Sequence, residues 1–180
     1  NNLGDIRRKD VKIGSKVLIR RSNEVIPEIL GAYEHTGKSV DIAPPETCPY
    51  CGAPVREEGA NLFCTNKNCR PRIAAQLANF ASKGAMDIEG FSEMTAYLLY
   101  DELGVRHYSD LYDLDKDRLS KLEGFGDKKI KNLLSAIAAS KNVPLDRFLF
   151  ALGIDGIGKV ACKDLEVRSK RVEASSGATA

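Results

Sequence analysis

The sequence predicts a multidomain chain that begins as a partial β segment, continues through a small four-cysteine module and ends as an all-α region. Three observations lead to this fold class. Apolar residues alternate with polar ones between Val11 and Ile19, as in a half-buried strand. Four of the five cysteines lie within residues 48–69. From Ile73 onward the apolar residues recur at helical spacing instead.

These changes of pattern predict four segments. The partial β domain should cover residues 1–43, because two consecutive prolines then form a stiff linker. The cysteine module should cover 44–72, and a helical domain of about three hairpins, the last one truncated, should cover 73–166. The last stretch, 167–180, is charged and then small and polar, so we expect a disordered tail.

The first segment is too small to fold by itself, because two or three strands cannot bury a core. It starts without a methionine, and we therefore expect its earlier strands to lie upstream of Asn1. It is also the basic part of the chain, since residues 1–21 carry seven basic and two acidic side chains within a net charge of +2. This favours contact with a polyanion, although a solvated charged rim would have the same composition.

The cysteines form two pairs, Cys48-x2-Cys51 and, after twelve intervening residues, Cys64-x4-Cys69. Thiolates that tight turns present in pairs are typical tetrahedral ligands of structural zinc. We predict one zinc ion held by all four, with no open position for a reacting water; four free buried thiols are the alternative. Cys162 lies in a helical run and is interpreted as a small core residue.

A short pattern recurs in the helical region: an apolar residue, a spacer, glycine, an apolar residue, a small residue and then a helix start. The copies lie at 88–93, 122–129 and 154–159, so they are 34 and 32 residues apart. Glycines allow a tight turn whose N–H groups face an anion, and the following helix presents its positive end at the same place. A helix-capping turn is the alternative for a single copy, but repetition favours binding to DNA phosphates.

The first copy is the weakest, because Ser92 replaces the second glycine and Glu93 follows where a cation would help. From the three copies we predict the following DNA contacts: Gly90, Gly124, Phe125, Gly126, Lys128, Lys129, Gly156, Gly158 and Lys159. Contacts of this kind position DNA without reading bases, so binding should be independent of base sequence and steeply dependent on salt.

Other function classes find little support in the sequence. No stretch approaches the roughly 20 apolar residues of a membrane span, and no signal-peptide pattern opens the chain, so we expect a cytoplasmic protein without a membrane partner. His35 and His107 lie in unrelated contexts, and no nucleophile or base is arranged beside either. We therefore predict no catalytic residue in this chain.

In this order, the segments resemble the C-terminal half of a bacterial NAD-dependent DNA ligase. Residues 6–30 resemble the end of its OB-fold domain, so the β segment would be an OB-fold remnant. The runs CPYCG at 48–52 and CTNKNC at 64–69 resemble its zinc finger, here a zinc-ribbon module. Three further runs resemble its tandem helix-hairpin-helix domain, at 85–90, 122–126 and 150–154.

The chain departs from the family pattern in three places. Arg70-Pro71-Arg72 follow the last zinc cysteine where the family usually has proline and alanine, and Asn23-Glu24 stand where it has Gly-Asp. The family's adenylated Lys-x-Asp-Gly motif does not occur in this sequence. The chain by itself should therefore be inactive.

The resemblance implies DNA binding within a ligase that seals nicks in replication and repair. It adds five basic side chains as expected phosphate contacts from the OB side: Arg7, Arg8, Lys16, Arg20 and Arg21. It further implies one structural zinc that orients the OB part relative to the hairpins, nicked duplex DNA as the partner, a monomer, and a place at the nucleoid in the bacterial cytoplasm. NAD and Mg²⁺ would be needed only by the full-length enzyme. A stand-alone zinc and hairpin adaptor in repair or recombination, without ligase activity, is the alternative.

Overall fold

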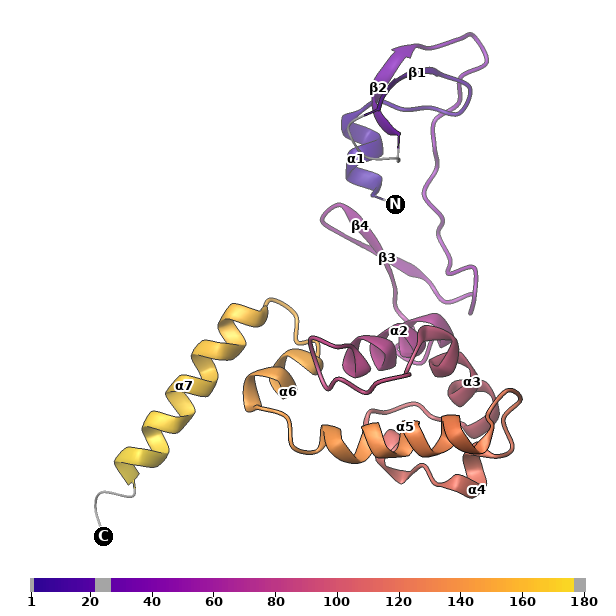
Figure 1. Cartoon of the computed structure of the whole chain (residues 1–180). Coiled ribbons are helices and arrows are strands. Elements are labelled where there is room, and N and C mark those ends of the chain that lie inside the picture. The colour runs from indigo at the N-terminus through magenta and orange to yellow at the C-terminus, as the bar shows by residue number, and fades with distance from the viewer. Residues whose placement is uncertain (1, 22–26, 177–180) are drawn as a thin grey trace. The chain divides into compact units, whose positions relative to one another are not determined.

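The computed structural model describes residues 2–21 and 27–176 of the 180-residue chain, in which two compact units, Asn1–Lys67 and Asn68–Ala180, are distinguished (Figure 1). Residues 23–26, which enter the resemblance, lie outside the described part. The predicted fold class is confirmed, because small β elements and a four-cysteine cluster precede a region whose regular structure is helical.

The first unit contains, among its described residues, one short helix and two antiparallel strand pairs, β1–β2 and β3–β4. The bounds are α1 Leu3–Arg8, β1 Lys16–Arg20, β2 Glu28–Glu34, β3 Val55–Glu58 and β4 Asn61–Cys64. Helix α1 falls in the segment for which the sequence pattern predicts strands. Its N-terminus is capped by the Asn2 side chain, whose oxygen accepts a hydrogen bond from the Asp5 N–H at 2.8 Å.

Strands β1 and β2 form a ribbon in which Val17 pairs with Ala32 and Ile19 with Ile29. The ribbon leaves large apolar side chains in solvent: Ile19 is 60% exposed and Tyr33 71%. Two strands offer no second layer that could cover both faces. The exposure therefore agrees with a partial β domain.

The second unit packs a series of helices around one core (Figure 1). The bounds are α2 Arg70–Ala81, α3 Glu93–Leu103, the 3₁₀ helix η1 Ser109–Asp113, α4 Lys116–Leu119, α5 Asp127–Ser140, α6 Leu145–Ala151 and α7 Lys159–Ser176. Leu77 and Phe80 from α2, Leu99 from α3 and Leu133 from α5 are all buried in this core. Phe80 also stacks on Tyr108, with ring centroids 4.4 Å apart. The packed helices thus hold the turns that connect them.

Helix α7 corrects the expectation of a disordered tail from residue 167, because the helix continues to Ser176. Charged straight-chain side chains such as Lys and Glu have good helix propensity, so a charged run does not by itself end a helix. Glu166 and Lys170 form an ion pair of 2.9 Å across one helical turn. Cys162, on the same helix, is buried as predicted. Residues 177–180 lie outside the described part.

Candidate metal centre and nucleic-acid interface

The four paired cysteines lie together in the structure. The Sγ atoms of Cys48, Cys51, Cys64 and Cys69 all lie within 4.8 Å of one another. The first pair is held by a tight turn, in which the Gly52 N–H donates to the Cys48 carbonyl at 2.9 Å while Gly52 has a φ of +70°. Only glycine adopts this backbone conformation readily, which explains its place next to the second ligand.

The β3–β4 hairpin then returns the chain to this turn. Val55, just after the first pair, is the antiparallel partner of Cys64, and the Cys51 and Cys64 Sγ atoms are 3.5 Å apart. Cys69 is the N-cap residue of α2. The positive end of that helix favours a negatively charged thiolate.

The donor set fits a structural metal ion. Zn–S bonds of about 2.3 Å in a tetrahedron place the sulfur atoms roughly 3.8 Å apart, which the observed cluster accommodates with small adjustments. Cys48 and Cys69 are buried, whereas Cys51 is exposed. Four thiolates would complete a tetrahedral coordination, so the cluster is compatible with a structural metal site.

The three glycine turns share one backbone geometry. We call them the first turn (88–92), the second turn (122–126) and the third turn (154–158). In each, the central glycine has a positive φ: +79° at Gly90, +75° at Gly124 and +78° at Gly156. The apolar residue after that glycine donates its N–H to the residue three positions earlier, at 3.2, 3.3 and 3.1 Å. Helices α3, α5 and α7 begin directly after these turns.

The glycines of the turns face open space. A Cβ atom placed on Gly124 or Gly126 would meet no heavy atom within 4 Å, and the same holds at Gly90, Gly156 and Gly158. Gly126 is the N-cap of α5 and offers no side chain, so the first N–H groups of that helix can be approached directly. The backbone therefore suits close approach by an anion.

The anchoring of the turns is unequal. Phe125 in the second turn is 6% exposed and belongs to the core, and Phe91 in the first packs partly against it. In the third turn, Ile157 is only half-buried and Ile154 is 45% exposed. Phe91 and Phe125 thus anchor their turns in the core, whereas Ile157 does not, because α6 and α7 pack mainly on each other.

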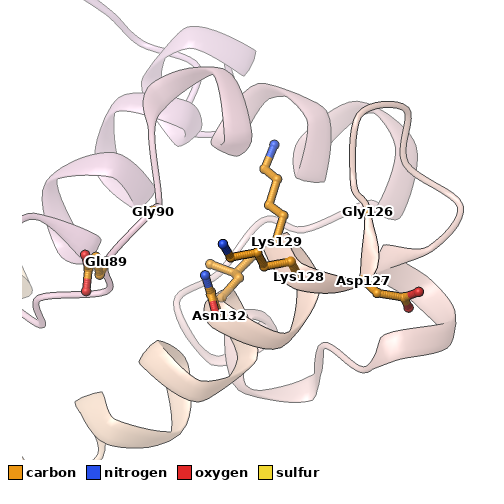
Figure 2. A pocket seen from close by; sticks show the side chains of 8 residues that line it. Glu89, Gly90, Gly126, Asp127, Lys128, Lys129 and Asn132 are labelled. Atoms are coloured by element: carbon orange, nitrogen blue, oxygen red, sulfur yellow. The ribbon is translucent and has the colours of Figure 1, made fainter.

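The first and second turns line one groove. It encloses about 540 Å³ and is lined by Glu89, Gly90, Gly126, Asp127, Lys128, Lys129, Asn132 and Leu133 (Figure 2). Lys129 also places its Nζ 3.8 Å from the centre of the Phe125 ring, which holds the ammonium group beside the second turn. The third turn does not line this groove. Sequence reasoning missed Asn132, although its position four residues after Lys128 places it on the same helix face.

Lys159, the expected contact of the third turn, lies elsewhere in the second unit. Its Nζ is 5.0 Å from the centre of the Phe150 ring, and a Cβ on Gly84 would lie 2.9 Å from it. Its ammonium group therefore lies beside the loop that follows α2.

Four of the five basic residues of the first unit that were expected to contact DNA are paired with carboxylates, which the sequence pattern does not indicate. Arg7 binds Glu57, Arg8 binds Asp5, Lys16 binds Glu34 at 2.6 Å, and Arg20 binds Glu28 at 2.8 Å. The hydrogen bond from Arg7 lowers the pKa of Glu57, so this carboxylate stays charged at neutral pH. Arg21 is exposed at the end of β1. The excess positive charge in the sequence is thus largely balanced locally.

Comparison with known proteins identifies the region that holds the groove. Residues 82–139 match the family model of the SAM-like helix-hairpin-helix tandem, which covers the first and second turns. Within the described residues, no helix is long and apolar enough to cross a membrane.

Nearly the whole chain is similar to bacterial DNA ligases. It is 49% identical over 176 residues to the DNA ligase of Alkaliphilus oremlandii, covering 97% of this chain and 27% of that protein. DNA ligase 1 of Clostridium acetobutylicum is 46% identical over 175 residues, covering 96% and 26%. A Clostridium botulinum DNA ligase is 45% identical over 181 residues, covering 99% and 27%. The chain thus spans about a quarter of the length of these relatives.

The ligase similarity, the hairpin tandem and the cysteine cluster fit a portion of a bacterial DNA ligase. They confirm the resemblance that the sequence indicated.

Proposed function

We propose that this chain is a DNA-binding portion of a NAD-dependent DNA ligase that seals nicks in replication and repair. The observation that carries the proposal is the groove in which two glycine turns, each at the start of a helix, meet Lys128 and Lys129. The chain has no catalytic residue of its own in this proposal, and the whole enzyme would use NAD and Mg²⁺. Its partner is duplex DNA, held without preference for base sequence.

The physical basis is electrostatic and steric. The N-terminal ends of α3 and α5 carry partial positive charge, and the open glycines let a phosphate reach their N–H groups. Lys128 and Lys129 supply full charges beside the second turn. Each neutralised phosphate releases counterions, so the logarithm of the binding constant should fall linearly with the logarithm of salt concentration.

Further phosphate contacts in this proposal come from the third turn with Lys159, and from Arg7, Arg8, Lys16, Arg20 and Arg21. Those arginines and lysines that form ion pairs would exchange a carboxylate for a phosphate. An exposed pair is worth at most about 1 kcal/mol, so the exchange costs little.

The metal in the cysteine cluster is zinc in this proposal, one ion per chain, because a set of four thiolates is typical of structural zinc sites. Its role is structural, and much of the folding free energy of the short cysteine segment would come from the metal. We also propose that the protein is monomeric and acts in the bacterial cytoplasm, on nucleoid DNA.

The proposal is tested by a matched pair of glycine substitutions. Gly124→Ala and Gly104→Ala each place one methyl group in open space on a backbone with φ near +70°, at +75° and +69°. Both should cost about 1–2 kcal/mol of stability, because alanine is strained in the left-handed region. Gly104 ends α3, at the opposite end of that helix from the first turn.

Affinity for a fluorescently labelled nicked duplex would be measured by anisotropy at several salt concentrations. Gly124→Ala should weaken binding, because the added methyl group keeps phosphate away from the turn, whereas Gly104→Ala should bind like the unchanged protein. Equal affinities for the two variants, or binding that does not depend on salt, would contradict the proposed function.

A further inference from the structure

The groove between the first and second turns contains carboxylate and amide side chains that phosphate binding does not explain, namely those of Glu89, Asp127 and Asn132. Asn132 reaches it from the second helical turn of α5, and Glu89 reaches it from the first turn (Figure 2). Both residues are exposed. A groove that bound only phosphate would be expected to contain cations, because a carboxylate repels phosphate.

We propose that Asn132 contacts an uncharged edge of the duplex, namely sugar or base-edge atoms that lie between the phosphates held by the two turns. The proposal rests on the proposed DNA binding and extends the interface from the turns along α5. Lys128 lies four residues before Asn132, so the two side chains follow each other on one face of the helix.

The chemistry of the two side chains supports an uncharged partner. The amide of Asn132 has two donor hydrogens and an acceptor oxygen, so it can bond to the acceptors that base edges and sugars present. The carboxylate of Glu89 only accepts hydrogen bonds, and it disfavours a phosphate in its part of the groove. Phosphates therefore bind at the open glycines of the turns, and the neutral part of the DNA lies between them, beside the side chains of Glu89 and Asn132.

The negative charge of Glu89 should also lower the affinity of the groove for DNA. Its charge lies close to the phosphates that flank the contact, so it weakens binding without affecting the fold. The groove would thus combine attraction from Lys128 and Lys129 with the opposing charges of Glu89 and of Asp127, which also pairs with Lys116 at 3.0 Å; this limits affinity and favours release of the DNA.

Two pairs of variants test the proposal in the full chain. Asn132→Ala is compared with Ser135→Ala, an exposed residue later in α5 that does not line the groove. Lys128→Ala is compared with Lys131→Ala, which removes the same charge from the same helix outside the groove. Alanine has the highest helix propensity, so loss of affinity in these variants cannot come from a weakened helix.

Affinity for a nicked duplex is measured by anisotropy over a range of salt concentrations. Asn132→Ala should bind roughly 3- to 10-fold more weakly with an unchanged salt slope, because the loss of one uncharged hydrogen bond releases no counterion. Lys128→Ala should reduce the salt slope by about 0.9. Ser135→Ala should have no effect, and Lys131→Ala should change affinity less than Lys128→Ala. Glu89→Gln should bind more tightly than the unchanged protein.

The inference is overturned if Asn132→Ala binds like Ser135→Ala, or if Glu89→Gln leaves affinity unchanged. If either result is found while Gly124→Ala binds DNA more weakly than the unchanged protein, the contact along α5 is rejected and phosphate binding at the turns stands. A Gly124→Ala variant of unchanged affinity would instead reject the proposed function.

Discussion

Arg147 connects α6 to the loop that precedes the first turn, and its removal should loosen that turn. Its Nε donates to the Ala85 carbonyl at 2.8 Å and an Nη donates to the Lys83 carbonyl at 2.9 Å. The same guanidinium lies 3.4 Å from a carboxylate oxygen of Asp87. Asp87 has a φ of +56°, a conformation that is unfavourable for a residue other than glycine unless its surroundings hold it.

The magnitude follows from these contacts. Hydrogen bonds that involve a charged group contribute about 1.5–3 kcal/mol each when they are well shielded from water. The Arg147 side chain is 30% exposed and Asp87 is more exposed still, so water replaces part of what is lost and the ion pair adds little. We expect Arg147→Ala to lower the free energy of unfolding by about 2 kcal/mol.

The assay is urea unfolding at neutral pH, followed by far-UV circular dichroism, together with anisotropy on a nicked duplex. Arg168→Ala, which removes an exposed arginine from α7, controls for the change in charge. Arg147→Lys keeps the charge near Asp87 but cannot bond to both carbonyls in the same way, so it should recover only part of the stability. DNA affinity should fall with Arg147→Ala, because the first turn is less well positioned. If Arg147→Ala unfolds at the same urea concentration as Arg168→Ala, the reasoning is refuted.

The remaining predictions concern the metal and one carboxylate. A chelator should remove one metal ion per chain and unfold the β3–β4 hairpin. Most of the far-UV helical signal should remain, because the core of the second unit is made by α2, α3 and α5. Loss of all helical signal would contradict this expectation and show that the helices depend on the metal. Asp110 accepts hydrogen bonds from the backbone N–H groups of Arg106 and His107 at 2.8 and 2.9 Å. Burial acts to raise the pKa of Asp110, but these hydrogen bonds outweigh burial, so the pKa is lowered below its usual value of 3.8. Because the pKa is lowered in the folded state, the contribution of Asp110 is present at neutral pH and is lost as pH falls through the lowered value. Asp110→Asn should therefore destabilise the protein by about 1 kcal/mol at neutral pH and by less below about pH 4, as measured by urea unfolding at both pH values; a destabilisation that is equal or larger in acid would contradict this assignment.

Features that depend on residues close together in the sequence were predictable from the sequence. The spacing Cys48-x2-Cys51 and Cys64-x4-Cys69 is enough to predict the cluster, because each pair is formed by a local turn. The same is true of α2: the helical spacing that begins at Ile73 predicts an amphipathic helix, and Ile73 and Leu77 on its apolar face are buried. The three glycine turns were also predictable, because a positive φ at the glycine is a local property.

Local sequence patterns were misleading where the packing of a neighbouring helix decides which face of a helix is buried. On α3, Met94 is 69% exposed while Ala96 and Leu99 are buried, although all three are apolar. The face that α2 and the rest of the core cover could not be read from α3 alone, since its hydrophobic residues surround much of the helix. Likewise, the length of α7 depends on helix propensity and packing against α6, which its polar composition hides.

By itself, the sequence determined the order of the segments, the cysteines that cluster and the positions of the turns, because each depends on residues close together in the chain. Only the tertiary structure decided which turns lie together, that Asn132 and Glu89 share their groove, and that four of the basic residues of the first unit that were expected to contact DNA are paired with carboxylates. The reason is physical: burial, charge pairing and the convergence of turns depend on distances between residues far apart in sequence, and packing alone sets those distances.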